Sequence, residues 1–141
     1  MVGGHLLEFC LQSEEVTEVI SIVRRSSGFQ HEKLQELIVA DLTEYTPDEA
    51  IFSNVEAAYF CIGVYTGAVP RDTFRKITVD IPVAFAKNLH QYSPQARFCL
   101  LSGQGADRTE KSRLMFAKDK GAAENQLSTI GFKGFHTFRP G

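Results

Sequence analysis

The sequence predicts an α/β fold, a doubly wound parallel sheet, and three observations carry this prediction. Short apolar segments alternate with segments of helical apolar spacing, which is typical of strands that are linked through helices. The alternation runs through all 141 residues without a repeat or a low-complexity segment. Several of the apolar runs are too continuous to have a solvated face, as in parallel sheets that helices cover on both sides. We therefore expect one domain over residues 1–141.

The elements are expected in the following order. A first helix covers residues 3–12, and a β-branched run that ends in two arginines forms a strand at residues 18–25. A short helix is expected over residues 31–37, before a strand at 36–42. The remaining predictions are a helix near 46–53 that starts at Thr46 or Pro47, a strand at 55–63, a long helix at 71–91, a strand at 96–103, a helix at 112–130 and a last strand at 133–141.

The sequence of the long predicted helix contains a proline that interrupts its regular hydrogen bonding. Its apolar residues recur at helical spacing and are Phe74, Ile77, Ile81, Phe85 and Leu89. Pro82 falls among them and has no N–H to donate to the preceding turn. We expect a kink or a local adjustment of the helix at this point.

The composition excludes several classes of function. A hydrophobic content of 43% and a charged content of 23% are ordinary for a soluble globular protein, and the net charge of −2 gives no general attraction to nucleic acid or to an anionic membrane. No apolar run is long enough to span a bilayer, and no signal peptide opens the sequence. The cytoplasm is therefore the expected compartment.

The cysteines and histidines show no spacing that is typical of a metal site or a disulfide framework. They are Cys10, Cys61, Cys99, His5, His31, His90 and His136. Each cysteine lies in an apolar stretch, which favours buried reduced thiols. We expect no metal.

The first strand of the predicted fold is missing. Doubly wound folds that bind nucleotides open with a strand and a glycine turn, whereas this sequence opens on "MVGG" and enters a helix at once. In the strand order 3-2-1-4-5-6 the absent strand is the central one. We expect its loss to separate the strand pair within residues 18–42 from the three strands within residues 55–138. We therefore expect that the chain is a fragment of a longer protein, or that another chain supplies the strand.

Five short segments carry a family resemblance across the chain. They are "VGGHLLEFCL", "VRR", "VADL", "CLLSGQGAD" with the lysine and glycine that follow it, and the terminal "FRPG". In order and spacing they resemble the atypical, extended group of short-chain dehydrogenases/reductases, whose members have a Rossmann-like NAD(P)-binding domain. The chain is most similar to the Tat-interacting oxidoreductase-like proteins in that group.

The resemblance implies a dinucleotide cofactor. Gly3 matches the last glycine of the family's glycine-rich turn, and the helix start around residues 3–5 offers N–H groups to an anion. Arg24 and Arg25 follow the strand where relatives distinguish their cofactors, and guanidinium groups there favour the 2′-phosphate of NADP over NAD. Solvated arginines at a strand end are the alternative interpretation.

Four further residues are implied on the cofactor side. Asp41 and the backbone of Leu42 match the position that borders the adenine, although a plain aspartate at a strand end is an alternative. Gly63 ends the strand past which the middle of the nucleotide runs, and it could equally be a turn glycine that needs a positive φ. Pro140 belongs to the terminal motif.

The catalytic residues of the family are only partly present. Ser102 matches the serine that polarises the substrate carbonyl, and Lys120 matches the lysine that binds the nicotinamide ribose and lowers the pKa of a tyrosine. That tyrosine lies four residues before the lysine in relatives, and here the position is Phe116. Gly103 also stands where relatives often carry a second serine. A solvated lysine, a capping serine and a core phenylalanine are the alternatives.

Three functions remain open at this stage. The first is an NADP-binding protein with weakened or absent catalysis, which acts as a sensor or scaffold. The second is an active NADP-dependent oxidoreductase on an unknown carbonyl or sugar-nucleotide-like substrate. The third is an interaction domain that has lost the cofactor. Relatives often form homodimers through the helices that match residues 71–91 and 112–130.

Overall fold

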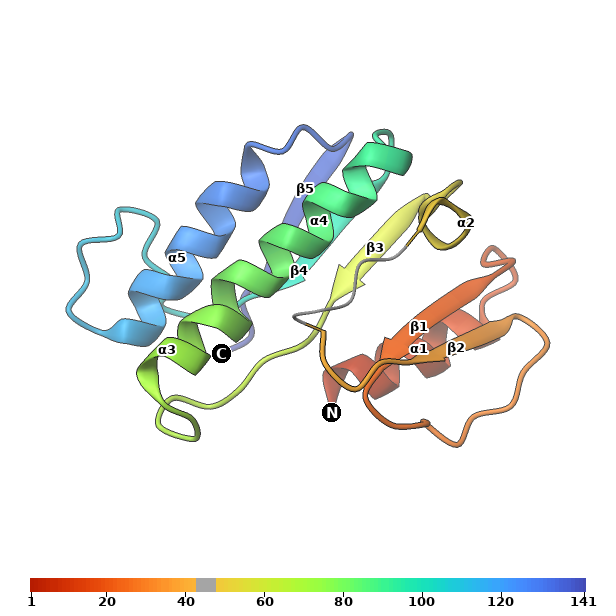
Figure 1. The fold of residues 1–141 in the computed structure, drawn as a ribbon, viewed down its shortest axis with the longest axis horizontal. Helices are drawn as coiled ribbons and strands as arrows, with labels where there is room; N and C mark the ends of the chain where they lie inside the picture. The colour runs from red at the N-terminus through yellow and green to blue at the C-terminus, as the bar shows by residue number, and fades with distance from the viewer. Residues whose placement is uncertain (43–47) are drawn as a thin grey trace. The chain divides into compact units, whose positions relative to one another are not determined.

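The computed structural model describes residues 1–42 and 48–141 and confirms the α/β class. Helices alternate with strands, and all strand pairs in the described residues are parallel. The chain divides into two compact units, Met1–Tyr45 and Thr46–Gly141, which are described separately below (Figure 1). The expectation of one domain over the whole chain stays a prediction.

The first unit contains one helix and a pair of strands. Its elements are α1 (Val2–Gln12), β1 (Val19–Val23) and β2 (Leu34–Ile38). β1 and β2 are parallel, with Val19 opposite Leu34 and Val23 opposite Ile38. Leu11 is the buried residue of α1.

Our prediction of a short helix over residues 31–37 is wrong. The backbone carbonyl of Lys33 accepts a hydrogen bond from the N–H of Val19 at 2.8 Å, so the segment already belongs to the sheet at this point. Residues 31–34 form a turn that the N–H of Leu34 closes on the carbonyl of His31. The amine of Lys33 donates to the carbonyl of Ser13 at 2.8 Å, just beyond the end of α1. A cation is favourable there because the last carbonyls of a helix lack partners.

The second unit contains a three-stranded sheet with its helices. The elements are α2 (Glu49–Phe52), β3 (Ala57–Phe60), α3 (Arg71–Arg75), the π-helical turn η1 (Lys76–Asp80), α4 (Ile81–Tyr92), β4 (Arg97–Leu101), α5 (Met115–Ser128) and β5 (Gly134–Phe138). The strand order is β3-β4-β5. Figure 1 shows α3, α4 and α5 on one face of this sheet. The side chain of Asp48 caps α2; Thr46 and Pro47, where we expected this helix to start, lie outside the described residues.

Aromatic rings fill the space between the sheet and its helices. The ring of Phe98, in the central strand β4, is fully buried. It stacks on Phe132 with 5.3 Å between the ring centres, and it also contacts Phe85 of α4 and Phe135 of β5. Parallel strands place alternate residues on one face, so this row of rings lies on the helix side of the sheet.

The long predicted helix is present, and its local adjustment precedes Pro82. The turn η1 is π-helical: the N–H of Ile81 donates to the carbonyl of Lys76, five residues earlier. A proline has no N–H for the carbonyl four residues before it, and a wider turn accommodates that loss. The extra residue shifts the buried face, so that Thr78 and Val79 are buried where the regular spacing predicted Ile77.

The last helix begins at Met115, three residues later than predicted. The N–H of Ser112 donates to the side chain of Asp107 at 2.8 Å, which holds the segment before the helix as part of a loop. The strands after residue 55 and the first strand are also shorter than expected, because the residues at their carboxyl ends do not continue the strand pairing.

The strands of the described residues form two hydrogen-bonded sheets, β1-β2 and β3-β4-β5. This grouping agrees with the predicted separation of a strand pair from a group of three. In the same residues, no helix combines the length and the apolar composition that a membrane crossing requires.

We expect Phe98→Ala to lower the free energy of unfolding by about 3–5 kcal/mol, because a buried ring is replaced by a cavity. The matched control is Phe138→Ala in β5, since Phe138 is 55% exposed and its loss should cost less than about 1 kcal/mol. Urea unfolding followed by circular dichroism measures both. Equal losses in the two variants would contradict the assignment of Phe98 to the core.

Candidate functional site

Both predicted catalytic residues, Ser102 and Lys120, lie at the carboxyl edge of the β3-β4-β5 sheet. In open parallel sheets, ligands bind where the strands end. Ser102 directly follows β4, and its N–H donates to the carbonyl of Phe138 at 2.8 Å. The N–H of Gln104 donates to the carbonyl of Pro140 at 3.2 Å. The segments after β4 and β5 are therefore joined by backbone hydrogen bonds.

A buried carboxylate lies beneath this junction. Glu124 of α5 is 1% exposed, and its Oε1 accepts a hydrogen bond from the hydroxyl of Ser102 at 2.7 Å. The guanidinium of Arg139 donates to both carboxylate oxygens, at 3.0 Å and 2.5 Å. Burial alone would raise the pKa of Glu124, but the hydrogen bonds from Arg139 and Ser102 reverse this effect and hold its pKa below the usual value.

In this arrangement Ser102 could polarise a substrate carbonyl only by giving up its hydrogen bond to Glu124. A serine hydroxyl has one hydrogen to donate, and Ser102 donates it to Glu124. To polarise a substrate carbonyl, the hydroxyl would have to break a hydrogen bond to a buried anion, which is among the stronger hydrogen bonds in proteins.

Lys120 lies next to the same junction. Its amine donates to the carbonyl of Leu101, the residue before Ser102, at 3.4 Å. The side chain is buried, and burial lowers the pKa of Lys120 while the Glu124 carboxylate partly raises it. The structure therefore places Ser102 and Lys120 at the same end of β4, where each already has a partner within the protein.

Phe116 points its ring end-on at Gly103. A Cβ added at Gly103 would lie 2.5 Å from Cζ of Phe116 and 3.4 Å from each of its two Cε atoms. These three distances together place that Cβ on the long axis of the ring, beyond Cζ. A tyrosine hydroxyl would extend from Cζ along this same axis. In this geometry, position 103 cannot carry a side chain beside Phe116, and position 116 cannot carry a hydroxyl without a shift of the loop.

Gly121 fixes the loop 102–114 against α5. A Cβ at this position would lie 1.7 Å from the carbonyl oxygen of Asp107, and the N–H of Asp107 in turn donates to the carbonyl of Ala117 at 2.8 Å. The glycine that follows the lysine is thus required for the close approach of loop and helix.

A second buried anion lies on α5. The carboxylate of Asp119 is completely buried and accepts hydrogen bonds from Arg71 and Arg75 of α3, the latter at 2.9 Å. These contacts raise the pKa of Arg71. They attach α3 to α5, beside the residues that the sequence singled out.

Four of the other predicted cofactor residues lie close together in the sequence of the first unit. Arg24 and Arg25 are exposed and begin the loop after β1. Asp41 and Leu42 lie three and four residues beyond the end of β2, so Asp41 does not end a strand as expected. Asp41 is exposed.

Gly3 and Gly63 differ from their expected settings. Gly3 lies inside α1, which begins at Val2, and the N–H groups of Gly4 and His5 both donate to the carbonyl of Met1. These two groups are therefore not available to an anion, in contrast to our expectation. Gly63 does not have a positive φ, so the alternative of a left-handed turn is wrong, and a Cβ there would meet no atom within 4 Å.

The sequence analysis missed two buried carboxylates and the exposed arginine that pairs with one of them. Asp119, Glu124 and Arg139 were not predicted as site residues, because charged residues on helices and at strand ends are usually solvated. One signal was present: Glu124 lies four residues after Lys120 and therefore on the same helix face. Each fully buried side-chain oxygen and nitrogen in the described residues has a hydrogen-bond partner.

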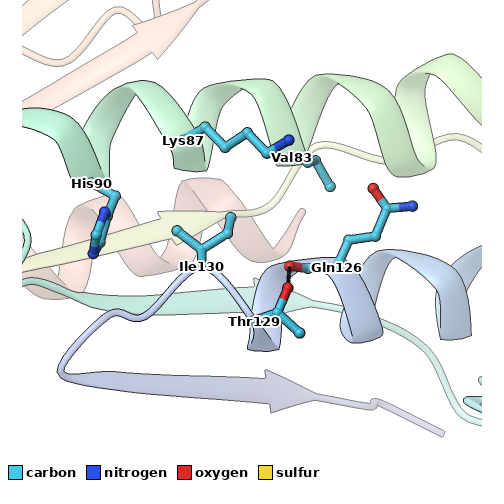
Figure 2. Close-up of a pocket in the computed structure, with 6 residues that line it drawn as sticks. All are labelled: Val83, Lys87, His90, Gln126, Thr129 and Ile130. Carbon is cyan, nitrogen blue, oxygen red and sulfur yellow. Dashed lines mark hydrogen bonds between the residues drawn. The ribbon is translucent and has the colours of Figure 1, made fainter.

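A separate pocket lies between α4 and α5, away from these residues. It has a volume of about 340 Å³, and Figure 2 shows its lining by Val83, Lys87, His90, Gln126, Thr129 and Ile130. The ring of His90 reaches the carbonyl of Gly131 at 3.3 Å. None of the predicted site residues lines this pocket.

The thiols and acidic groups offer no metal site among residues 1–42 and 48–141, where no group of three or more histidine, cysteine, aspartate or glutamate residues is arranged to hold a metal ion. Cys99 is buried, whereas Cys10 and Cys61 are only partly buried, so the expectation of three buried thiols is corrected for these two. Burial raises the pKa of all three thiols.

Comparison with known proteins supports the fold. No protein-family model matches the chain, and no curated protein matches it in sequence. Its structure is similar to that of a short-chain dehydrogenase family protein from Francisella tularensis subsp. tularensis SCHU S4, with a TM-score of 0.69 and 18% identity. The match covers 99% of this chain and 64% of that one. The predicted doubly wound, Rossmann-like fold class is therefore confirmed, and the chain spans 64% of the length of this structural neighbour.

Glu124→Gln tests the buried carboxylate. A folded-state pKa below the unfolded value means that the carboxylate stabilises the fold above about pH 4, and that this contribution disappears as the pH falls through the folded pKa. We expect the variant to lose about 1–3 kcal/mol near pH 7, because Arg139 stays partly solvated. The loss should shrink towards pH 3.

The measurement is urea unfolding at several pH values. Glu110→Gln is the matched control, since Glu110 is exposed and accepts one hydrogen bond from Asn125; it should change stability by less than about 0.5 kcal/mol. A loss in Glu124→Gln that does not depend on pH would contradict the role of the carboxylate charge.

Proposed function

We propose that this chain is an NADP-binding domain of the short-chain dehydrogenase/reductase type in which hydride transfer is weak or absent. Its sequence motifs favour the atypical group and, within it, the Tat-interacting oxidoreductase-like proteins. A cytoplasmic protein that pairs through α4 and α5 as a homodimer belongs to the same proposal.

The end-on contact between Phe116 and Gly103 is the observation that carries the proposal. Carbonyl reduction needs an acid that gives a proton to the substrate oxygen. Phenylalanine has no such proton, and the ring axis leaves no space for a hydroxyl at position 116 beside the backbone of Gly103. Ser102 and Lys120, the two polar groups nearby, both donate to acceptors inside the protein.

The residues present fit a dinucleotide in two respects. Arg24 and Arg25 supply exposed guanidinium groups at the strand end where a 2′-phosphate is recognised. Gly63 leaves open space beside the backbone after β3, as the close approach of a nucleotide requires. When bound, the reduced cofactor NADPH would carry a hydride that it can donate; the residues of this chain would bind and orient the cofactor.

Calorimetric titration with NADP⁺ and NAD⁺ tests cofactor binding. We expect micromolar binding of NADP⁺ and at least about tenfold weaker binding of NAD⁺, because forked guanidinium contacts to a phosphate have no counterpart on a hydroxyl. Arg24→Ala and Arg25→Ala should each reduce the preference. Lys111→Ala, which removes an exposed cation from the loop before α5, is the control. Binding of neither nucleotide would favour the cofactor-free interaction domain instead.

Carbonyl reduction by the unmodified chain and by Phe116→Tyr tests the absence of catalysis. We expect no NADPH-dependent turnover above background with either protein, and a lower melting temperature for Phe116→Tyr, because the hydroxyl would enter the space of the Gly103 backbone. Phe135→Tyr, in β5, is a control for the added hydroxyl. Turnover by the unmodified chain, or a clear gain in Phe116→Tyr, would favour an active oxidoreductase.

A further inference from the structure

The loop after β1 forms hydrogen bonds to a carboxylate of the same chain, the side chain of Glu36. Glu36 of β2 accepts hydrogen bonds from the N–H of Ser27 at 3.2 Å and 3.1 Å, one to each carboxylate oxygen. The hydroxyl of Ser27 donates to the same carboxylate at 2.6 Å. Hydrogen bonds from Ser27 and then Ser26 lower the pKa of Glu36. The carboxylate is therefore ionised near neutral pH.

The backbone explains why the donors converge. The parallel register places Glu36 beside Ser21 of β1, five residues before Ser26. The loop then turns back over the strand pair through Gly28, which has a φ of +80°. The hydroxyls of Ser26 and Ser27 also accept hydrogen bonds from the N–H groups of Gly28 and Phe29, respectively. This turn presents a backbone N–H and serine hydroxyls to one acceptor.

The same loop begins with the two arginines. Arg24 and Arg25 directly precede Ser26, and both are exposed. Guanidinium groups, serine hydroxyls and backbone N–H groups are the donors that proteins use for phosphate. A carboxylate and a phosphate accept hydrogen bonds from the same kinds of donor. Both are negatively charged, so they repel each other at short distance.

We propose that Glu36 competes with the 2′-phosphate of NADP for the donors of Ser27 and so sets the preference between NADP and NAD. This inference rests on the proposed function. NADP binds only when its phosphate displaces the Glu36 carboxylate from Ser27. NAD carries a hydroxyl at that position, and it binds with the carboxylate in place. Glu36 therefore reduces the preference for NADP that the two arginines provide.

The test is the ratio of dissociation constants for NADP⁺ and NAD⁺, measured by calorimetry on three variants. Glu36→Gln keeps a side-chain oxygen for Ser27 and removes the charge; NADP⁺ should bind about fivefold more tightly, with NAD⁺ unchanged. Ser27→Ala removes the hydroxyl, and NADP⁺ should bind more weakly. Glu32→Gln, which makes the same change of charge nearby in the sequence, should leave the ratio unaltered. Circular dichroism confirms that each variant is folded.

Opposite shifts in Glu36→Gln and Ser27→Ala distinguish competition from a loss of loop structure, which would weaken NADP⁺ binding in both. An unchanged ratio, or weaker NADP⁺ binding in Glu36→Gln, overturns the role of Glu36 and leaves the proposed function intact. If no variant and no unmodified protein binds either nucleotide, the proposed function fails and this inference fails with it. If Glu36→Gln does not fold, unchanged NADP⁺ binding in Ser27→Ala overturns the inference.

Discussion

The carboxylate of Glu124 holds together the carboxyl edge of the three-stranded sheet. A buried anion is unfavourable unless hydrogen bonds and an opposite charge compensate it. Here both come from elements other than the helix that carries the carboxylate. Ser102 comes from the end of β4 and Arg139 from the end of β5, while Glu124 itself belongs to α5. The charge of Glu124 is compensated by contacts that join these three elements. That arrangement also fixes the height of α5 along the sheet, and with it the positions of Phe116 and Lys120.

The helix α5 shows how a weakly apolar segment can be buried. Its buried residues lie on several sides of the helix; four of them are small, Ala117, Gly121, Ala122 and Ala123, and three are ionisable residues that bond inside the protein. Small residues let the loop 102–114 approach the helix backbone, as the contact at Gly121 demonstrates. The ionisable residues form hydrogen bonds and ion pairs with neighbouring elements, and these contacts stabilise the helix in place of packing by large apolar side chains. Ser102 and Lys120, which the sequence suggests as catalytic residues, form hydrogen bonds in this fold that hold α5 against the end of β4.

Most of the fold could be predicted from the sequence, because β-branched runs and helical spacing are local signals. The failure at residues 31–37 has a non-local cause: the hydrogen bond between Val19 and the Lys33 carbonyl joins residues that only the folded sheet brings together. The candidate site was predicted in part. Ser102 and Lys120 were found through a motif, whereas the partners that restrain them come from other elements. The contact between Gly103 and Phe116 depends on the path of a loop, which no spacing in the sequence encodes.

The π-helical turn before Pro82 has a consequence for how this helix could change length. A π turn contains one residue more than the α-helical turn it replaces, so the apolar stripe of α4 is out of phase with that of α3 by about one residue. Deleting a single residue within Lys76–Asp80 would restore a regular phase, but it would leave Pro82 without the wider turn that accommodates its missing N–H, and it would rotate Arg71 and Arg75 relative to Asp119. In related sequences, an alignment gap of one residue at this turn would therefore mark a difference in helical phase, and the two sides of such a gap should be compared as separate helices.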